Sequence, residues 1–580
     1  MLELTLSDYI IKAKKIESNF GKSIKLAILS SFTVNGLKEV LTVKCGEIKV
    51  SAEIYVAGYN QYRQELLDDN SNLYKFKPEI VYLLLDTRSI LSELFFLPYQ
   101  VNHQSRKKYI SQQLKEIFSL VDGFTKKSDS KLVVTNLSLP TYSPLGIADE
   151  KVEFSLNDAV TYFNDGIKSR YLADDQVFVY DFNSFANRFG ENNIFDPKMY
   201  YLGDIKISPD YLPYLVENFV SYVKVALSLN RKCIVLDLDN TLWGGIVGED
   251  GFDGIQLSPQ PPGNVYYEFQ KYLLALFQKG IILAINSKNN EADAMKVIRD
   301  HPYMILRPDN FAAFRINWQD KVKNMEEIAQ ELNIGLDSLV YFDDDPINRE
   351  MIKKYLPEVK VIDLPRDPSL YVRSLQSLND FDTFQVTMED QKRGKMYIDE
   401  RQRREFQSEF SNLDDFLKSL NIKVTIKPGD SFTTPRISQL TLKTNQFNLT
   451  TRRYTEEDIK KFIGSDDHLV YSVQVEDKFG DQGIVGVIII NCEKEWQIDT
   501  FLLSCRVIGR NIEKVMLDFI INVAKKKQAK RIIGQYVATE KNKPCVGLYQ
   551  DNGFQKNEDG LFVFDLLNNF FGPDYIKLID

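Results

Sequence analysis

The sequence predicts a multidomain protein of the α/β class, with two domains built on mostly parallel sheets and a last domain of the α+β type. The chain has 580 residues, which is longer than a single hydrophobic core usually fills. Before Leu375, short apolar segments alternate with polar segments of helical character, as in βαβ units. After Leu375 the pattern changes to a long amphipathic helix and then to longer strands.

Residues 1–220 are expected to form the first α/β domain. Its apolar segments predict four strands: residues 24–30, 80–86, 132–136 and 177–182. Ser30 and Ser31 end the first strand, and Asn136 ends the third. Residues 211–227 are predicted to form a helix that leads into the central strand of the chain.

The strand-end serines and asparagine resemble those of the SGNH/GDSL hydrolases, which implies an SGNH-like or flavodoxin-like fold. Such an enzyme needs a histidine base to activate its serine. The chain has three histidines, His103, His301 and His468. None lies in residues 182–210, where the base is expected. We therefore predict a degenerate, esterase-like domain that serves binding or assembly.

Residues 231–251 carry the clearest chemical signal. Residues 233–236 form a short apolar run, as in a strand buried on both faces. Asp237 and Asp239 follow at its carboxyl end, where open α/β sheets bind ligands. A carboxylate there can attack phosphorus if a cation offsets its charge, and an acid two residues on can protonate the leaving group. The pattern predicts a phosphoryl-transfer domain at residues 221–378.

This stretch and the motifs after it resemble the haloacid dehalogenase (HAD) superfamily of aspartyl phosphotransferases. The string LDLDNTLWGGIVGEDG is similar to the FkbH-like branch of subfamily IIIC. Asn286 ends a predicted strand, a helix is predicted at residues 320–332, and residues 339–342 lead into an acidic run. The resemblance implies a Rossmann-like HAD core and four catalytic residues: Asp237, Asp239, Ser287 and Lys321. Lys323 lies close enough in sequence to compete with Lys321.

The resemblance also implies a magnesium ion, Mg²⁺, held by acidic residues of this core. Its expected ligands are Asp237, the backbone carbonyl of Asp239, and Asp343 or Asp344. We expect four further residues to bind the phosphorylated substrate: Asn240, Thr241, Asn286 and Lys288. Hydrolysis of a simple phosphomonoester needs only the catalytic residues and the metal-binding acids.

The intervals between the motifs leave no room for a large cap domain. A Gly-rich flap at residues 244–254 and a helix at residues 265–277 fill much of the first interval. An open site admits a phosphoryl group carried on something bulky, such as an acyl carrier protein. FkbH-like proteins load a glyceryl group from 1,3-bisphosphoglycerate onto such a carrier. Members that do so have a cysteine where this chain has Asn286.

We therefore predict a Mg²⁺-dependent phosphatase or phosphotransferase that acts in a specialised acyl or cell-surface glycan pathway. The alternative is a glyceryl or acyl transferase of the FkbH type that loads an acyl carrier protein. A third reading is a scaffold that docks a carrier protein and whose outer domains are inactive. Basic residues suited to attracting an acidic carrier are Lys443, Arg452, Arg453 and those within residues 525–531.

After a helical linker at residues 379–420, residues 421–580 are predicted to form the α+β domain. A turn containing Gly509 opens an amphipathic helix, and helix N-terminal amides suit a pyrophosphate. The spacing N-x2-C-x3-Y-x3-G-F begins at Asn542. Together these motifs resemble the GNAT acyltransferase fold, although Asn511 stands where Gly or Ala is usual. The resemblance implies that coenzyme A or phosphopantetheine binds at Arg506, Gly509, Arg510, Asn542 and Tyr549.

Composition limits the partners and the compartment. A net charge of -9 argues against a protein that binds nucleic-acid backbones. The longest apolar runs are far shorter than the ~20 residues of a membrane helix, so no membrane partner is expected. The five cysteines form no CxxC pair, which indicates reduced thiols and a cytoplasmic location.

Overall fold

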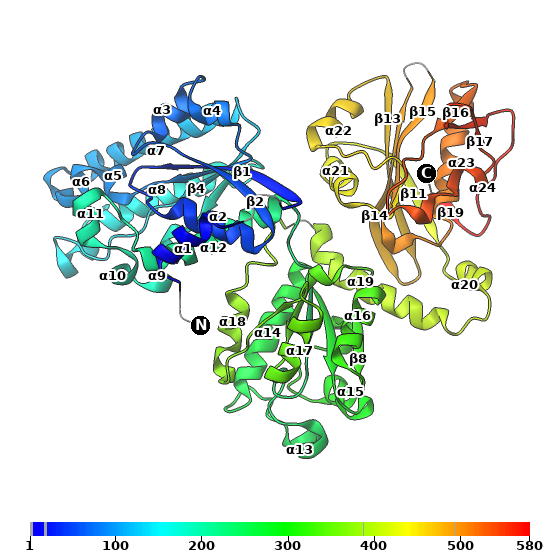
Figure 1. Ribbon diagram of the computed structural model, residues 1–580, viewed down its shortest axis with the longest axis horizontal. Helices are drawn as coiled ribbons and strands as arrows, with labels where there is room; N and C mark the ends of the chain where they lie inside the picture. The colour runs from blue at the N-terminus through cyan, green and yellow to red at the C-terminus, as the bar shows by residue number, and fades with distance from the viewer. Residues whose placement is uncertain (1–3, 17–19, 387, 493–494, 580) are drawn as a thin grey trace. The chain divides into compact units, whose positions relative to one another are not determined.

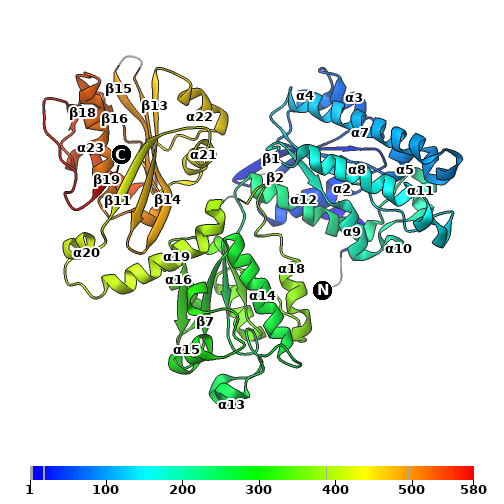
Figure 2. The ribbon, with the colours of Figure 1, turned by 180° about the vertical axis from the view of Figure 1, so that it is seen from behind.

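The computed structural model describes residues 4–16, 20–386, 388–492 and 495–579. The chain separates into two compact units, one of residues 1–230 with 379–385 and one of residues 231–378 with 386–580. Figures 1 and 2 show the helices and strands of both from opposite sides. In the described part of the chain, no helix has the length and apolar character needed to cross a membrane.

The first unit contains a parallel sheet of five strands in the order β2-β1-β3-β4-β5. The strands are β1 (Lys22–Ser30), β2 (Val50–Val56), β3 (Ile80–Leu84), β4 (Lys131–Thr135) and β5 (Val177–Tyr180). This is the order of flavodoxin-like doubly wound sheets. The predicted parallel α/β domain is confirmed, while its likeness to SGNH hydrolases stays a prediction.

Alternate residues of β1 pack on opposite faces of this sheet. Leu26 and Ile28 belong to the core under α2 (Leu37–Glu47) and α12 (Leu212–Ala226). Ala27 and Leu29 belong to the core under α7 (His103–Thr125) and α8 (Leu156–Tyr171). The sheet is therefore covered on both sides, as its continuous apolar strands require. The helices are α1 (Leu6–Ala13), α2 (Leu37–Glu47), α3 (Tyr62–Leu67), α4 (Asn72–Phe76), α5 (Thr87–Leu91), α6 (Glu93–Phe96), α7 (His103–Thr125), α8 (Leu156–Tyr171), α9 (Phe182–Phe189), α10 (Glu191–Ile194), α11 (Pro197–Gly203) and α12 (Leu212–Ala226).

The second unit begins with another parallel five-stranded sheet, in the order β10-β9-β6-β7-β8. The strands are β6 (Cys233–Leu236), β7 (Ile282–Ser287), β8 (Ala313–Ile316), β9 (Leu339–Phe342) and β10 (Lys360–Val361). The helices around it are α13 (Val247–Gly254), α14 (Asn264–Lys279), α15 (Glu291–Asp300), α16 (Lys321–Glu331), α17 (Pro346–Tyr355) and α18 (Tyr371–Gln376). The predicted strands and helices of the central domain are confirmed.

Two helices, α19 (Met388–Gln407) and α20 (Leu413–Ser419), connect this sheet to the last domain. The last domain has a mixed, mostly antiparallel sheet in the order β17-β18-β16-β15-β14-β13-β11-β19. Its elements are β11 (Lys423–Pro428), α21 (Thr434–Lys443), β12 (Phe447–Asn448), α22 (Glu456–Ile463), β13 (His468–Asp477), β14 (Gly480–Asn491), β15 (Trp496–Leu503), α23 (Ile512–Lys526), β16 (Arg531–Gly534), α24 (Leu548–Asp551), β17 (Gln555–Lys556), β18 (Phe562–Asp565) and β19 (Lys577–Ile579). The predicted α+β character is confirmed.

Candidate phosphoryl-transfer site

The central strand β6 delivers Asp237 to the carboxyl edge of the second unit's parallel sheet. β6 pairs with β7 on one side and with β9 on the other, so loops from all three strands meet at this edge. The backbone N–H of Asp237 donates to the carbonyl of Phe342 at 2.9 Å, which extends the sheet by one residue. The Asp237 side chain is 10% exposed, enough for a small group to reach it.

Lys321 bridges two of the acids at this edge. Its Nζ donates to Oδ1 of Asp237 at 2.8 Å and to Oδ2 of Asp343 at 2.7 Å. Lys321 is the first residue of α16, and the side chain of Asp320 caps that helix. Lys323 lies on the exposed side of the same turn. The structure therefore brings Lys321, and not Lys323, to the acids.

Three carboxylates form a cluster with ligand chemistry suited to a divalent cation. Oxygen atoms of Asp237, Asp343 and Asp344 all lie within 4.8 Å of one another. Burial raises the pKa of Asp237 to about 6 against the opposing effect of Lys321, and burial with the two neighbouring carboxylates raises that of Asp344 to about 7. A hard cation with oxygen ligands would offset this repulsion, so the residues fit Mg²⁺.

The hydroxyl of Tyr341 also contacts Asp343, which is fully buried. Oδ1 of Asp343 accepts the backbone N–H of Asp345 at 2.8 Å. These contacts and Lys321 hold the Asp343 carboxylate in one orientation. Tyr341 could not be predicted as part of this site, because a tyrosine within an apolar strand gives no signal of its own.

Ser287 ends β7 and is 1% exposed. A hydrogen bond from its side chain opposes the rise in the pKa of Asp237. The structure therefore brings Ser287 to the predicted nucleophile. Thr241 is fully buried, and its Oγ1 accepts the backbone N–H of Asp344 at 3.2 Å. Thr241 thus braces the acidic loop after β9.

The side-chain amide of Asn286 is bonded to two residues of α16. It is fully buried, and its Nδ2 donates to the carbonyl of Lys321 at 2.9 Å. Its Oδ1 accepts from Nδ2 of Asn324 at 3.1 Å. The amide thus fixes the start of α16, and with it Lys321, while contact of Asn286 with substrate stays a prediction.

The other two predicted substrate residues are Asn240, which is bonded within the chain, and Lys288, which is exposed. Oδ1 of Asn240 accepts the backbone N–H of Gly245 at 2.9 Å, and the residue has a φ of 53°. Asparagine tolerates this left-handed conformation, which turns the chain from β6 into the flap. Lys288 is exposed at the end of β7 and stays a predicted substrate contact.

Asp239 lies beside Asp237 but faces the flap. Its carboxylate accepts hydrogen bonds from Trp243, Val247 and Asn289. The flap is a short loop that contains α13, and two backbone hydrogen bonds between Gly244 and Gln256 close its base. Between β7 and β8 the structure has only α15 and a short 3₁₀ turn. The described residues of this sheet carry no large cap.

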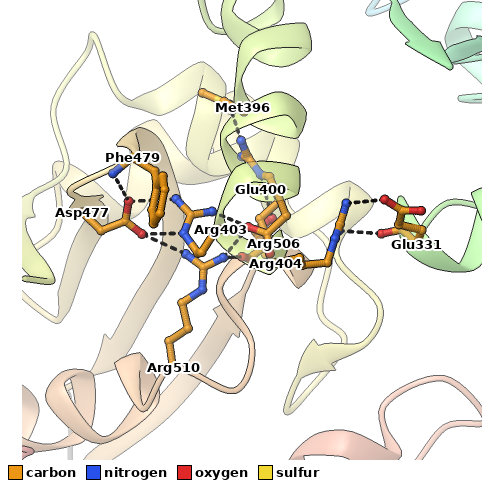
Figure 3. Close-up of polar contacts among 10 residues, drawn as sticks. Glu331, Met396, Glu400, Arg403, Arg404, Asp477, Phe479, Arg506 and Arg510 are labelled. Carbon is orange, nitrogen blue, oxygen red and sulfur yellow. Dashed lines mark hydrogen bonds and ion pairs between the residues drawn. The ribbon is translucent and has the colours of Figure 1, made fainter. Parts of the chain in front are cut away.

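Two of the predicted cofactor residues, Arg506 and Arg510, contact side chains of α19, and Figure 3 shows the network of charged side chains there. Arg510 is 6% exposed and pairs with Glu400 and Asp477. Arg403 donates to both oxygens of Asp477 at 2.7 and 2.8 Å. The Arg510 guanidinium is thus bound by carboxylates of its own chain, which competes with a role in binding a pyrophosphate.

Arg506 contacts the sulfur of Met396 on α19, and Gly509 is exposed with a φ of 80°. Asn542 is fully buried and bonded to the carbonyls of Asn448 and Val537 at 3.0 and 2.9 Å. The Tyr549 hydroxyl is buried and has no hydrogen-bond partner. Asn542 and Tyr549 thus lie in the interior of the domain, and the role of these four residues toward coenzyme A stays a prediction.

A segment of the chain fills the space where β15 and β16 separate. These two strands pair only at Trp496 and Gln497. Farther along, Phe447 and Asn448 pair with the end of β15. The N–H of Leu449 donates to Phe501, and its carbonyl accepts from Val537 beyond β16, at 3.2 and 2.8 Å. Residues 447–449 therefore act as an extra strand in that gap.

In the first unit, Ser30 and Ser31 are buried at 5% and 1% exposure. Their Oγ atoms accept backbone N–H groups of Phe32 and Asp86 at 3.1 and 2.8 Å. The described hydrogen bonds of these serines include no histidine. Nδ2 of Asn136 donates to Asp181 at 2.8 Å. The degenerate, esterase-like character of this domain stays a prediction.

Two of the basic residues considered for docking have partners within the last domain. Arg452 pairs with Asp499, and Arg453 donates to the carbonyls of Thr441 and Thr444. Lys443 lies in α21, and its side chain is outside the described residues. Arg452 and Arg453 therefore stabilise the last domain internally, which weakens the case for them as a docking patch.

Comparison with known proteins gives a family model that matches part of the chain and a likeness to a solved structure. Residues 25–224 match the family model described as FkbH, N-terminal domain. No curated protein matches the chain. The crystal structure of the N-terminal part of the protein BF1531 from Bacteroides fragilis contains a phosphatase domain complexed with Mg. It is similar to this chain with a TM-score of 0.61 and 29% identity, over 66% of this chain and 100% of that one.

Two further solved structures match shorter parts of the chain. One is a domain from Methanocaldococcus jannaschii DSM 2661, with a TM-score of 0.21 and 11% identity over 25% of this chain and 99% of that one. The other is a mutant of spermidine N-acetyltransferase SpeG from Vibrio cholerae, with a TM-score of 0.20 and 15% identity over 25% and 94%. Both likenesses are weak, and no function of this chain is inferred from them. The chain is thus similar to FkbH proteins in its N-terminal part and to a phosphatase-containing structure over the share stated above.

Proposed function

We propose that the chain is a Mg²⁺-dependent phosphatase or phosphotransferase of the HAD type that acts through an aspartyl-phosphate intermediate. The observation that carries the proposal is the buried contact of Lys321 with Asp237 and Asp343 at the carboxyl edge of the sheet. A carboxylate beside a fixed ammonium group can meet an anionic phosphate with less repulsion. The likeness to a phosphatase-containing structure supports the same reading.

Asp237, Asp343 and Asp344 would hold the Mg²⁺ ion, with the backbone carbonyl of Asp239 as a further ligand. When bound, the ion supplies positive charge that offsets the phosphoryl oxygens and the carboxylates. Lys321 supplies a second positive charge and keeps Asp237 from rotating. The Ser287 hydroxyl donates to an oxygen of the phosphoryl group.

The residues of the chain carry the reaction in two steps. An oxygen of Asp237 forms a bond to phosphorus as the bond to the leaving oxygen breaks, and Asp239 gives that oxygen a proton. Asp239 then takes a proton from water, which attacks the phosphorus and releases phosphate from Asp237. A phosphotransferase uses another acceptor in place of water.

The substrate we propose is a phosphomonoester on a bulky carrier, such as an acyl carrier protein, in an acyl or cell-surface glycan pathway. The absence of a large cap over the described part of this sheet leaves room for such a carrier. We place the reaction in the cytoplasm, because Cys45, Cys233, Cys492 and Cys545 are free thiols. Loading of a glyceryl group is less favoured, since Asn286 is a buried structural residue.

For the last domain we propose a GNAT-like fold with a structural role. Two observations favour this over acyl transfer. The guanidinium of Arg510 forms ion pairs with Glu400 and Asp477. Residues 447–449 fill the gap between β15 and β16. A ligand carrying pyrophosphate would have to displace carboxylates that are already bonded to Arg510.

A phosphatase screen tests the proposed function. The full chain is assayed with Mg²⁺ against small phosphomonoesters, aryl phosphates and phosphorylated acyl-carrier conjugates. Hydrolysis that disappears in Asp237→Asn and persists in Asp293→Asn, an exposed aspartate on α15, is the expected result. Equal activity in Asp237→Asn and the parent chain would refute the covalent mechanism.

A further inference from the structure

Three N–H groups converge on the carboxylate of Asp239. The indole Nε1 of Trp243 donates to Oδ1 at 2.8 Å, and the backbone N–H of Val247 donates to the same oxygen at 3.1 Å. Nδ2 of Asn289 donates to Oδ2 at 2.8 Å. Because donors reach both oxygens, the carboxyl group is fixed against rotation about its last torsion.

The two side-chain donors are themselves held rigidly. Trp243 is fully buried at the base of the flap, and Asn289 is 4% exposed between β7 and α15. Oδ1 of Asn289 accepts the backbone N–H of Asn290 at 3.1 Å, which orients the amide so that its Nδ2 points to Asp239. A donor fixed by its own contacts imposes its direction on the acceptor.

The numbers of bonds distinguish the two oxygens of Asp239. Oδ1 accepts two N–H groups, whereas Oδ2 accepts one. A carboxyl proton needs a free lone pair, and Oδ2 has more of this capacity left. Oδ2, the oxygen that Asn289 orients, thus keeps the greater capacity for a further bond.

We propose that Asn289 and Trp243 are positioning residues for the general acid of this site, with Oδ2 of Asp239 as the oxygen that delivers the proton. This inference rests on the proposed phosphatase function. In the first step the bond from phosphorus to the leaving oxygen breaks, and its electron pair stays on that oxygen. The proton on Oδ2 passes to the same oxygen, so a neutral alcohol departs and Asp239 becomes a carboxylate.

Leaving groups that differ in basicity separate positioning of an acid from general support of the fold. Phenolate needs a proton to depart, whereas 2,4-dinitrophenolate departs without one. The value of kcat/KM reports the steps up to the first irreversible one, which includes departure of the leaving group. Loss of general acid catalysis should therefore lower kcat/KM for phenyl phosphate much more than for 2,4-dinitrophenyl phosphate.

Two variants remove one donor each from the full chain. Asn289→Ala removes the bond to Oδ2, and we expect kcat/KM for phenyl phosphate to fall about 10²-fold. Trp243→Phe keeps the buried ring and removes the indole N–H, and we expect a fall of about tenfold, the value of one hydrogen bond. Both should change the rate with 2,4-dinitrophenyl phosphate only slightly.

Asn324→Ala is the matched control, because Asn324 is an equally buried amide whose bonds go to Asn286 and Asn317. Its effect should be the same for both substrates. Losses of equal size for both substrates in Asn289→Ala and Trp243→Phe would overturn the inference. If Asn289→Ala does not fold, Trp243→Phe decides the question alone.

Asp239→Asn separates failure of this inference from failure of the proposed function. It should show the steepest dependence on the leaving group, as expected for loss of the acid itself. If the loss of kcat/KM depends on the leaving group in Asp239→Asn but not in the two positioning variants, only the inference fails. If the loss of kcat/KM in Asp239→Asn is the same for both leaving groups, or if the parent chain hydrolyses neither aryl phosphate, the proposed function fails and the inference with it.

Discussion

Nζ of Lys321 lies 2.8 Å from Oδ1 of Asp237, although the two residues are 84 positions apart in the sequence. The contact is buried, and the lysine has 4% of its side chain exposed. Removing one partner of such a pair leaves an uncompensated charge. The contact thus couples the position of the predicted nucleophile to the start of α16.

Asp237→Asn should abolish turnover while the fold is retained, because the amide keeps the shape but cannot attack phosphorus. We expect a loss in kcat of about 10⁴-fold or more, as for other removed nucleophiles. Steady-state assay of the full chain, with far-UV circular dichroism as a check on folding, measures this. Retention of more than about a hundredth of the parent rate would contradict a covalent mechanism.

Chelation of Mg²⁺ should remove activity, and added Mg²⁺ should restore it, because phosphoryl transfer here needs an added positive charge. Asp343→Asn and Asp344→Asn should each weaken Mg²⁺ binding, and calorimetry measures the change in affinity. Asp345→Asn is the control, since asparagine also serves well at the helix N-cap that Asp345 occupies. Full activity in excess chelator would refute the metal requirement.

Ser30→Ala and Ser31→Ala should leave any ester hydrolysis by the chain unchanged. Both hydroxyls are buried and accept backbone N–H groups, so neither is set up as a nucleophile. The assay uses p-nitrophenyl acetate and the full chain. A hydrolysis rate above background that either substitution removes would show that the first unit is a working esterase.

Coenzyme A should give no heat of binding with the parent chain or with Asn511→Gly. The substitution removes the Asn511 side chain from the start of α23, but Arg510 remains paired with Glu400 and Asp477. The double variant Glu400→Gln with Asn511→Gly removes one of these carboxylates and is the variant in which binding is expected first. Tight binding by the parent would show that the domain retains its cofactor site.

Arg403→Met should destabilise the second unit by about 3–5 kcal/mol, because it leaves the buried carboxylate of Asp477 without its main partner. Arg404→Met is the control: Arg404 is 32% exposed and pairs with Glu331, so its loss should cost about 1 kcal/mol or less. Thermal unfolding, monitored by proteolytic cleavage of α19, compares the stability of the two variants. Equal effects would mean that the buried pair contributes no more than a surface pair.

Local patterns predicted the residues that follow directly from a strand. Cys233 to Leu236 could be recognised as a buried strand, and this placed Asp237 at the carboxyl edge. The choice between Lys321 and Lys323 needed the structure, because both lie in one helical turn and differ only in the face they occupy. The strand β2 was missed because its residues are largely half-exposed and give no continuous apolar run.

Contacts between distant residues could not be predicted. Arg510 was assigned to a pyrophosphate because it follows a glycine at a helix start, yet its carboxylate partner Glu400 is 110 positions away. The structural role of Asn286 also depends on Asn324, 38 positions later. A sequence shows which side chains can bind an anion or a substrate, but which of them the fold has already satisfied depends on tertiary packing.

The first unit is completed by residues 379–385, which the ribosome makes only after the whole phosphatase-like sheet. Within that unit, Nζ of the buried Lys224 donates to Asn379 and Asp380 at 2.8 and 3.3 Å, and Phe384 stacks on Phe178. A nascent chain that has reached only Asn230 therefore holds a lysine without these partners. These contacts can form only after the residues of the central sheet have been synthesised, and a gene fragment that ends before Asn379 lacks all of them.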